Sequence, residues 1–143
     1  MTVSSILAAK GRDVISIEPG ATLADAARLL TAKRIGAALI LGADRRIVGI
    51  ISERDIVRVL AERGAAALDE PVSRTMTREV ETCTAGETVS TIMERMTVGK
   101  FRHMPVLEQG RVIGLVSIGD IVKHRLGEME REQAAMRDYI SAG

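Results

Sequence analysis

The chain has 143 residues and a mass of 15.4 kDa, enough for one compact domain or for two small units that share a core. A formal net charge of +1 argues against a nucleic-acid binder that neutralises many phosphates, and two aromatic residues, Phe101 and Tyr139, are too few for a base-stacking platform. The single cysteine allows no intramolecular disulfide. One cysteine and two histidines are also too few for a dedicated zinc site. No stretch reaches the ~20 apolar residues of a membrane span, and no signal peptide is evident. We therefore expect a cytoplasmic protein without a membrane partner.

The first half of the chain predicts alternating helices and strands. In order, they are a helix over residues 3–10, a strand over 14–17, a helix after Thr22, strands over 37–41 and 47–51, and a helix over 55–63. Thr22 and Asp25 form a capping-box pattern, and Gly11 and Gly64 are placed to end helices. The helix over 55–63 is expected to bury Ile56, Val57, Val59 and Leu60.

The second half repeats this order after an alanine-rich connector at residues 64–70. Pro71 suits the start of a short helical turn over residues 71–76. The elements expected after it are a strand over 80–83, a helix after Thr88, strands over 103–107 and 112–116, and a last helix from Asp120 towards Ile140.

The two halves match residue by residue. Thr22 and Thr88 lie 66 residues apart, as do Val14 and Val80, Gly20 and Gly86, and Leu41 and Leu107. After the hairpin turn the distance becomes 65, where a change of loop length costs little. The sequence therefore predicts an internal duplication with two paired units.

A glycine–serine–aspartate motif closes each repeat. Its copies are Gly49-Ile50-Ile51-Ser52-Glu53-Arg54-Asp55 and Gly114-Leu115-Val116-Ser117-Ile118-Gly119-Asp120. Each copy predicts a buried strand ending on a serine that caps the next helix, with an aspartate in the first turn of that helix. Such an acid stabilises a helix start by itself, so one copy would be compatible with a purely structural role. The presence of both residues in both halves favours a binding corner.

This duplicated β-α-β-β-α order, with the motif in both copies, resembles a tandem pair of cystathionine-β-synthase (CBS) domains, known as a Bateman module. The sequences IISERDIV at residues 50–57 and FRHMPVL at residues 101–107 are very similar to that family, and the resemblance covers residues 1–125. It implies an α+β fold of two pseudo-symmetric CBS units packed sheet to sheet, with a C-terminal helical extension. We place the first unit, with its N-terminal helix, at residues 1–68 and the second, with its C-terminal helix, at residues 69–143.

The resemblance also implies that the motif corners bind an adenine nucleotide. Asp55 and Asp120 would each accept hydrogen bonds from the two hydroxyls of a ribose. Ser52 and Ser117 would face the ribose or phosphate while also capping their helices.

Basic residues near the two corners differ between the copies. Arg54 precedes Asp55, whereas Gly119 holds the same place in the second copy. Arg54 could be a solvated cation or a phosphate arm. Further candidate arms are Arg102 and His103, which resemble the family's phosphate-contacting pair, and Lys33 and Arg34, which precede the corresponding strand in the first copy. An arm need not come from the same repeat as its aspartate, so the pairing stays open.

Ile17 and Cys83 occupy matched places in the first strand of each unit. In the resembled family this strand lines the adenine slot, so both residues are candidates for the site. Core packing explains a small apolar side chain at either place equally well.

The last helix carries an apolar stripe that either packs across a dimer or folds back on its own unit. Its residues, at alternating spacings of four and three, are Val122, Leu126, Met129, Gln133, Met136 and Ile140. CBS pairs usually dimerise into a flat disc of four units, and the resemblance implies such a homodimer here.

We expect the chain to be a regulatory sensor of AMP, ADP, ATP or NAD(H). Ligand would stabilise one arrangement of the pair, and an unidentified partner protein would respond to the difference. The alternative is a structural dimeric adaptor with unoccupied clefts, which leaves two complete motifs unexplained. An enzyme is the weakest hypothesis, because the sequence contains no Ser-His-acid set, metal cluster or matched carboxylate pair.

Overall fold

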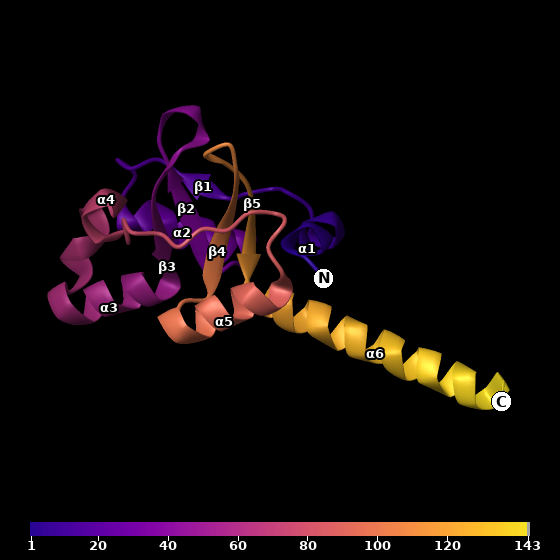
Figure 1. The fold of residues 1–143 in the computed structure, drawn as a ribbon. Coiled ribbons are helices and arrows are strands. Elements are labelled where there is room, and N and C mark those ends of the chain that lie inside the picture. The colour runs from indigo at the N-terminus through magenta and orange to yellow at the C-terminus, as the bar shows by residue number, and fades with distance from the viewer. Residues whose placement is uncertain (143) are drawn as a thin grey trace.

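Figure 1 shows a computed structural model of the chain, which describes residues 1–142. Its elements are α1 (Val3–Lys10), β1 (Ser16–Ile17), α2 (Leu23–Lys33), β2 (Ala37–Leu41), the 3-10 helix η1 (Ala43–Arg45), β3 (Ile47–Ser52), α3 (Glu53–Arg63), the 3-10 helix η2 (Ala65–Asp69), α4 (Val72–Thr75), α5 (Val89–Gly99), β4 (His103–Glu108), β5 (Arg111–Ser117) and α6 (Ile118–Ala142). The order confirms the expected α+β class with a C-terminal helix.

Each unit contains one small sheet. In the first, β1 pairs parallel with β2, and β2 pairs antiparallel with β3. In the second, β4 and β5 form an antiparallel pair. The register of both hairpins shifts at the same place, after Ile40 in one and after Val106 in the other. This shared irregularity agrees with the duplication inferred from the sequence.

The strand expected over residues 80–83 is wrong in extent. Only Cys83 pairs, in a single parallel bridge to Val106, with its N–H 3.0 Å from the Pro105 carbonyl. The carbonyl of the preceding Thr82 instead accepts a 2.9 Å bond from the Arg95 guanidinium. The Thr82 carbonyl faces away from β4, so this bond ties the segment to α5 and not to the sheet.

Two apolar cores form, one in each unit, and the short helices α1 and α4 are exchanged between them. Val3, Ile6 and Leu7 of α1 are buried in the second unit's core, together with residues of α5 and β4. Val72 and Met76, at α4, are buried in the first unit's core. The boundary proposed after residue 68 stays a prediction. Each core, however, contains residues from both sides of this boundary.

Matched backbone bonds hold the two exchanged helices in place. The N–H of Val3 donates to the Glu87 carbonyl at 2.9 Å, and the N–H of Val72 donates to the Ala21 carbonyl at 2.7 Å. The motif glycines allow the close approach of each helix, since a Cβ on Gly114 would lie 2.6 Å from Leu7 and one on Gly49 would lie 2.7 Å from Met76. We find here a packing reason for glycine in both motifs.

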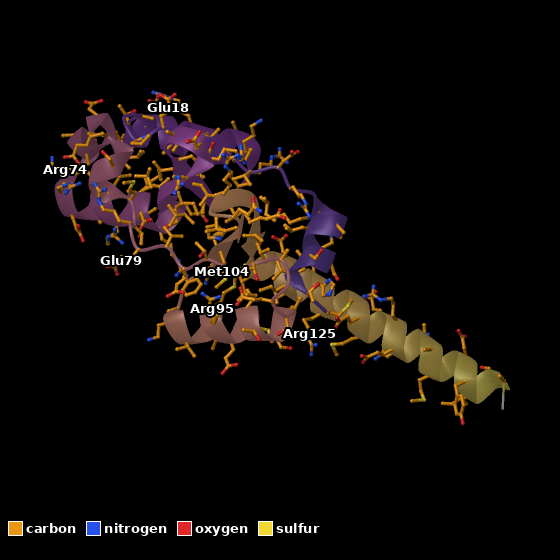
Figure 2. The ribbon with its side chains drawn as sticks, turned by 45° about the horizontal axis from the view of Figure 1, so that its top comes forward. Glu18, Arg74, Glu79, Arg95, Met104 and Arg125 are labelled. Atoms are coloured by element: carbon orange, nitrogen blue, oxygen red, sulfur yellow. The ribbon has the colours of Figure 1, made fainter. Side chains whose placement is uncertain are left out.

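Both faces of the first sheet are buried. Ala38 and Ile40 belong to the first core, whereas Leu39, which points to the other face of β2, is also fully buried. The strands of the two units lie together in the middle of the molecule, with α3 and α5 outside them (Figure 1). Met104 of β4 lies in this interior (Figure 2).

The structure corrects one expectation about a helix face and decides between two alternatives for another. Val57 was expected to be buried but is 65% exposed, because it lies on the outer side of α3, away from Ile56 and Val59. The last helix does not fold back: α6 leaves the body near Arg125 and projects away from it (Figures 1 and 2). Its apolar residues Val122, Leu126, Met129, Met136 and Ile140 are exposed.

Candidate functional site

The first motif forms a tightly bonded corner between β3 and α3. The Ser52 hydroxyl accepts a 3.2 Å bond from the Asp55 amide, and Asp55 Oδ2 accepts bonds from the Ser52 amide at 2.9 Å and from its hydroxyl at 3.0 Å. These reciprocal bonds form a capping box, as the sequence predicts for a serine and an acid at this spacing. Arg58 donates to Asp55 Oδ1 at 3.2 Å from the next turn of the helix.

The second motif forms the same corner between β5 and α6, with one addition. Asp120 Oδ2 accepts a 2.9 Å bond from the Ser117 amide, and the Asp120 amide donates to the Ser117 hydroxyl at 3.1 Å. The ammonium of Lys10, from α1, also donates to Asp120 Oδ2 at 2.7 Å. Burial would raise the pKa of Asp120, but the bonds from Lys10 and Ser117 outweigh it and hold that pKa below its usual value.

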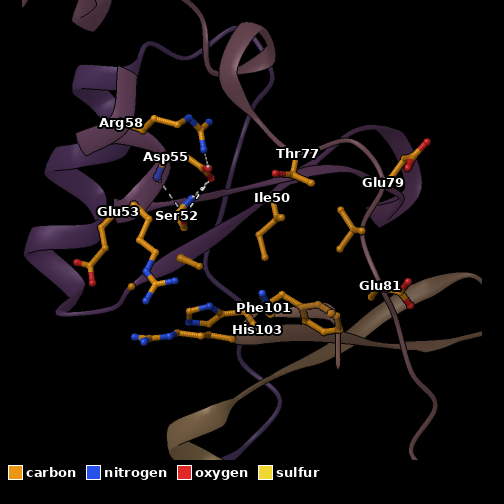
Figure 3. Close-up of a pocket in the computed structure, with 17 residues that line it drawn as sticks. Ile50, Ser52, Glu53, Asp55, Arg58, Thr77, Glu79, Glu81, Phe101 and His103 are labelled. Atoms are coloured by element: carbon orange, nitrogen blue, oxygen red, sulfur yellow. Dashed lines mark hydrogen bonds and ion pairs between the residues drawn. The ribbon is translucent and has the colours of Figure 1, made fainter. Parts of the chain in front are cut away.

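A cavity of about 520 Å³ opens at the first corner, between the two units. Ser52, Arg54 and Asp55 line it from one unit, and Arg102 and His103 line it from the other. In Figure 3, Ser52, Asp55 and Arg58 form one wall, while Phe101 and His103 lie across the cavity from them. The structure therefore brings together five of the predicted site residues from both repeats.

The hydrogen bonds at the helix starts explain why residues from different strands meet here. The Glu53 amide donates to the Gly36 carbonyl at 3.0 Å, which ties α3 to the entrance of β2. The matching bond in the second unit runs from the Ile118 amide to the Arg102 carbonyl at 2.8 Å. Gly36 lies close to the imidazole of His103, because a Cβ on it would be 3.6 Å from His103 Cε1.

The cavity walls carry charges of both signs. The basic residues are Arg54, Arg58, Lys100 and Arg102, and the acidic residues are Glu53, Asp55, Glu79 and Glu81. Glu81 is already paired with Arg95 at 2.8 Å. Burial lowers the pKa of His103 below its usual value, so its imidazole is neutral at pH 7 and can both donate and accept a hydrogen bond.

Six predicted site residues lie outside the set that lines this cavity. Ser117 and Asp120 form the second corner, and the other four lie elsewhere. Cys83 is 3% exposed in the second core, where burial raises the pKa of its thiol to about 11. Ile17 packs against the first core. Lys33 ends α2 with an exposed side chain, and Arg34 lines a neighbouring hollow of about 400 Å³ that shares Gly36 and Glu53 with the cavity.

Sequence reasoning missed several residues of the cavity. Thr77, Glu79 and Glu81 come from the segment before the second unit's bridge to Val106, and no local pattern connects them with the first motif. Arg58 had a usable signal, since it follows Asp55 at the spacing of three that also separates Arg28 from Asp25.

Residues 1–142 contain neither a metal-binding cluster nor a membrane-spanning helix. No group of three or more His, Cys, Asp and Glu side chains is arranged to bind a metal ion there. None of the helices in that range is both long enough and apolar enough to cross a membrane.

Comparison with protein-family models finds the CBS domain twice, at residues 3–62 and 72–127. The chain is 31% identical over 150 residues to "CBS domain-containing protein CBSX3, mitochondrial" of Arabidopsis thaliana, covering 99% of this chain and 73% of that protein. It is 34% identical over 111 residues to an uncharacterized 17.7 kDa protein of Acidianus ambivalens, covering 77% and 66%. The chain spans only 22% of another relative, CBSCBSPB2 of Arabidopsis thaliana.

Solved structures share the fold. The CBS-domain containing protein ATU1752 of Agrobacterium tumefaciens is 45% identical, with a TM-score of 0.85 over 87% of this chain and 99% of that one. The CBS domain protein PAE2072 of Pyrobaculum aerophilum, solved with AMP, is 30% identical, with a TM-score of 0.75 over 84% and 89%. The CBS domain pair of protein MJ0100, solved with 5′-methylthioadenosine and S-adenosyl-L-methionine, is 26% identical, with a TM-score of 0.80 over 90% and 98%.

Proposed function

The chain belongs to the CBS-domain family, and from this premise we propose that it is a regulatory module that reversibly binds an adenine nucleotide. One observation carries the proposal. A single cavity of about 520 Å³ unites Ser52, Arg54 and Asp55 of one unit with Arg102 and His103 of the other. This volume lies in the range of about 300–1,000 Å³ that is typical of small-molecule sites.

The ligands of similar proteins point to the adenosine group. AMP, 5′-methylthioadenosine and S-adenosylmethionine, named with two of the similar structures, all contain an adenine base and a ribose. We propose AMP, ADP, ATP or NAD(H) as ligands, because the basic side chains that line the cavity suit a phosphate. S-adenosylmethionine, whose added charges are cationic as well as anionic, is a second class to test against them.

Each residue has a proposed role. Asp55 would accept hydrogen bonds from the ribose hydroxyls, with Arg58 moving aside into solvent, since its side chain is already 54% exposed. Ser52 would keep the carboxylate oriented through its two bonds to it. Arg54 and Arg102 would contact the phosphate, and the neutral imidazole of His103 would add a hydrogen bond from the opposite wall.

Binding in this cavity would couple the two units. A ligand held between Asp55 and Arg102 favours the arrangement in which both residues face it, and a partner with a different affinity for that arrangement would transmit the signal. We therefore propose a regulatory role and assign the described residues no catalytic role.

A structural dimeric adaptor is the second candidate function. It is favoured by the exposed apolar residues of α6, which are available to pack against another chain. This function predicts no response to nucleotides.

Thermal unfolding with AMP, ATP, NADH and S-adenosylmethionine tests the two functions against each other. A specific ligand at a hundred times its dissociation constant should stabilise the protein by about 2.7 kcal/mol. Asp55→Ala should weaken binding at least about tenfold, since a hydrogen bond to a charged group contributes about 1.5–3 kcal/mol.

The chain contains a matched control for this variant. Thr22, Asp25 and Arg28 form the same capping box and ion pair at the start of α2, but outside the residues that line the cavity. Asp25→Ala should therefore leave ligand affinity unchanged. No shift with any of the four ligands would contradict nucleotide binding and favour the adaptor, and equal losses in both variants would show that helix capping, not ligand contact, is responsible.

A further inference from the structure

The two exchanged helices end differently, and the difference brings a lysine to the second corner. α4 ends at Thr75, and the chain then straightens so that Thr77 forms a bridge with Ile50. α1 occupies the matching place in the other unit but continues as a helix to Lys10. The longer helix carries the Lys10 side chain over the motif of the second unit.

The lysine takes over a hydrogen bond that the backbone makes in the first unit. There, the Thr77 amide donates to the Ile50 carbonyl at 2.9 Å. Leu115 holds the place of Ile50 in the second motif, and its carbonyl accepts a 2.8 Å bond from the Lys10 ammonium. The same ammonium donates to Asp120 Oδ2 at 2.7 Å, so it bridges strand and helix at the corner.

The two aspartates therefore differ in the cation that holds them, although the Asp120 side chain is 23% exposed and that of Asp55 only 13%. Asp55 is paired with Arg58 of its own helix, an exposed side chain that can leave without disturbing another element. Asp120 is paired with Lys10, whose helix is anchored by the buried Val3 and Leu7. Because Lys10 is only 34% exposed and makes two bonds here, a ribose would have to replace both of them to reach the carboxylate.

We propose that Lys10 is a built-in occupant of the second corner, so that each chain binds one adenine nucleotide, at the Asp55 corner. Lys10 supplies to Asp120 the hydrogen-bond donors that the ribose supplies to Asp55. This inference rests on the proposed nucleotide-binding function. It adds the stoichiometry, one nucleotide per chain, and names Lys10 as the residue that determines it. Removal of the Lys10 ammonium opens the second corner to the same class of ligand.

Isothermal titration with AMP tests the proposal on the full chain. The wild type should bind one AMP per chain, and Lys10→Met, which keeps an apolar stem for packing, should bind two. Asp55→Ala should lose measurable binding, and Asp55→Ala combined with Lys10→Met should regain one AMP per chain. Lys123→Met is the matched control, because Lys123 is an exposed lysine of the same corner, in the place that Arg58 has in the first unit; its stoichiometry should stay at one.

Several results would overturn the inference and leave the proposed function intact. They are two AMP per wild-type chain, one AMP per chain for Lys10→Met, or a loss of wild-type binding on Asp120→Ala that equals the loss on Asp55→Ala. Absence of binding in the wild type and in every variant would reject the proposed function and the inference together. Circular dichroism on each variant separates loss of binding from loss of folding.

Discussion

At the scale of single residues, the chain contains three helix starts with the same reciprocal bonds and three different surroundings. Asp25 is on the open surface, Asp55 lines a cavity, and Asp120 is ion-paired with Lys10 of α1. The local sequence predicts the capping geometry of all three, because a side chain three residues from a serine or threonine meets it across one helical turn. Which of them can meet a ligand depends on neighbours far away in the chain.

The ion pair at Asp120 predicts a pH dependence of stability. Since the folded state holds the pKa of Asp120 below its usual value, ionised Asp120 stabilises the fold above the unfolded pKa of about 3.9, and this contribution is lost as the pH falls through that value and below. Asp120→Asn should therefore reduce the free energy of unfolding at pH 7, by on the order of 1 kcal/mol. The difference from the wild type should shrink towards pH 3.

Urea denaturation at pH 7, 5 and 3.5 measures this difference. Asp138→Asn, at an exposed position of α6, is the control and should match the wild type throughout. A difference between wild type and Asp120→Asn that stays constant over this range would contradict a stabilising charge on Asp120.

At the scale of elements, the exchange of α1 and α4 organises both cores. α1, at the start of the first unit, contributes apolar side chains to the core of the second unit, and α4, at the start of the second unit, contributes them to the core of the first. Each helix also packs against a motif glycine. Gly49 and Gly114 therefore have a structural role that the motif pattern alone did not indicate.

Replacement of these glycines by alanine should destabilise the fold to different extents. A Cβ at Gly49 would meet the Thr77 carbonyl oxygen at 2.8 Å as well as the Met76 side chain, and the backbone cannot easily move. The three atoms nearest to a Cβ at Gly114 all belong to the flexible side chain of Leu7. We expect Gly49→Ala to cost about 2–3 kcal/mol and Gly114→Ala about 1 kcal/mol less, in the range known for overpacked cores.

Chemical denaturation of the two variants compares these costs. Gly86→Ala is the control, since a Cβ there meets no atom within 4 Å and the variant should be nearly neutral. Equal stability of Gly49→Ala and wild type would show that α4 does not pack against β3 as closely as described.

At the scale of the whole molecule, α6 carries an apolar stripe away from the body. Leu126 and Met129 are each more than half exposed, and Tyr139 and Ile140 near the end are more exposed still. A contiguous apolar face of this kind is costly in water unless another surface covers it. The family resemblance implies a homodimer, and the stripe is the natural part of this chain to stabilise one.

Light scattering on an eluted gel-filtration peak tests this prediction. The wild type should have twice the chain mass of 15.4 kDa, and the double variant Leu126→Glu/Met129→Glu should have the mass of one chain. Ala134→Glu/Ala135→Glu adds the same charge to α6 outside the stripe and should remain dimeric. A monomeric wild type would reject the dimer, and a dimeric stripe variant would place the contact on another surface.

Much of the fold could be predicted from the sequence, because the capping and spacing patterns are local and occur in both repeats. Helix caps at Thr22, Ser52 and Thr88 and the spacing of matched residues placed most elements within a few positions. The failures have tertiary causes. The segment over residues 80–83 pairs with β4 only through the bridge from Cys83 to Val106, and Val57 is exposed because the neighbours of α3 cover only its other side.

The candidate site divides in the same way. The serine, aspartate and arginine of the first motif, and the Arg102-His103 pair, could be proposed from residue type and resemblance. That these two sets face one cavity, while Cys83 and Ile17 pack into cores, required the positions of the two units relative to each other.

The sequence by itself determined two copies of one folding unit, each ending in a serine–aspartate corner at the start of a helix. It did so because strand alternation, capping and turns depend on residues a few positions apart. Only the tertiary structure decided that the corners differ, with Asp55 open to a cavity and Asp120 bonded to Lys10, 110 residues away. No local pattern specifies that contact, since it arises from burying the apolar face of α1 in the opposite unit.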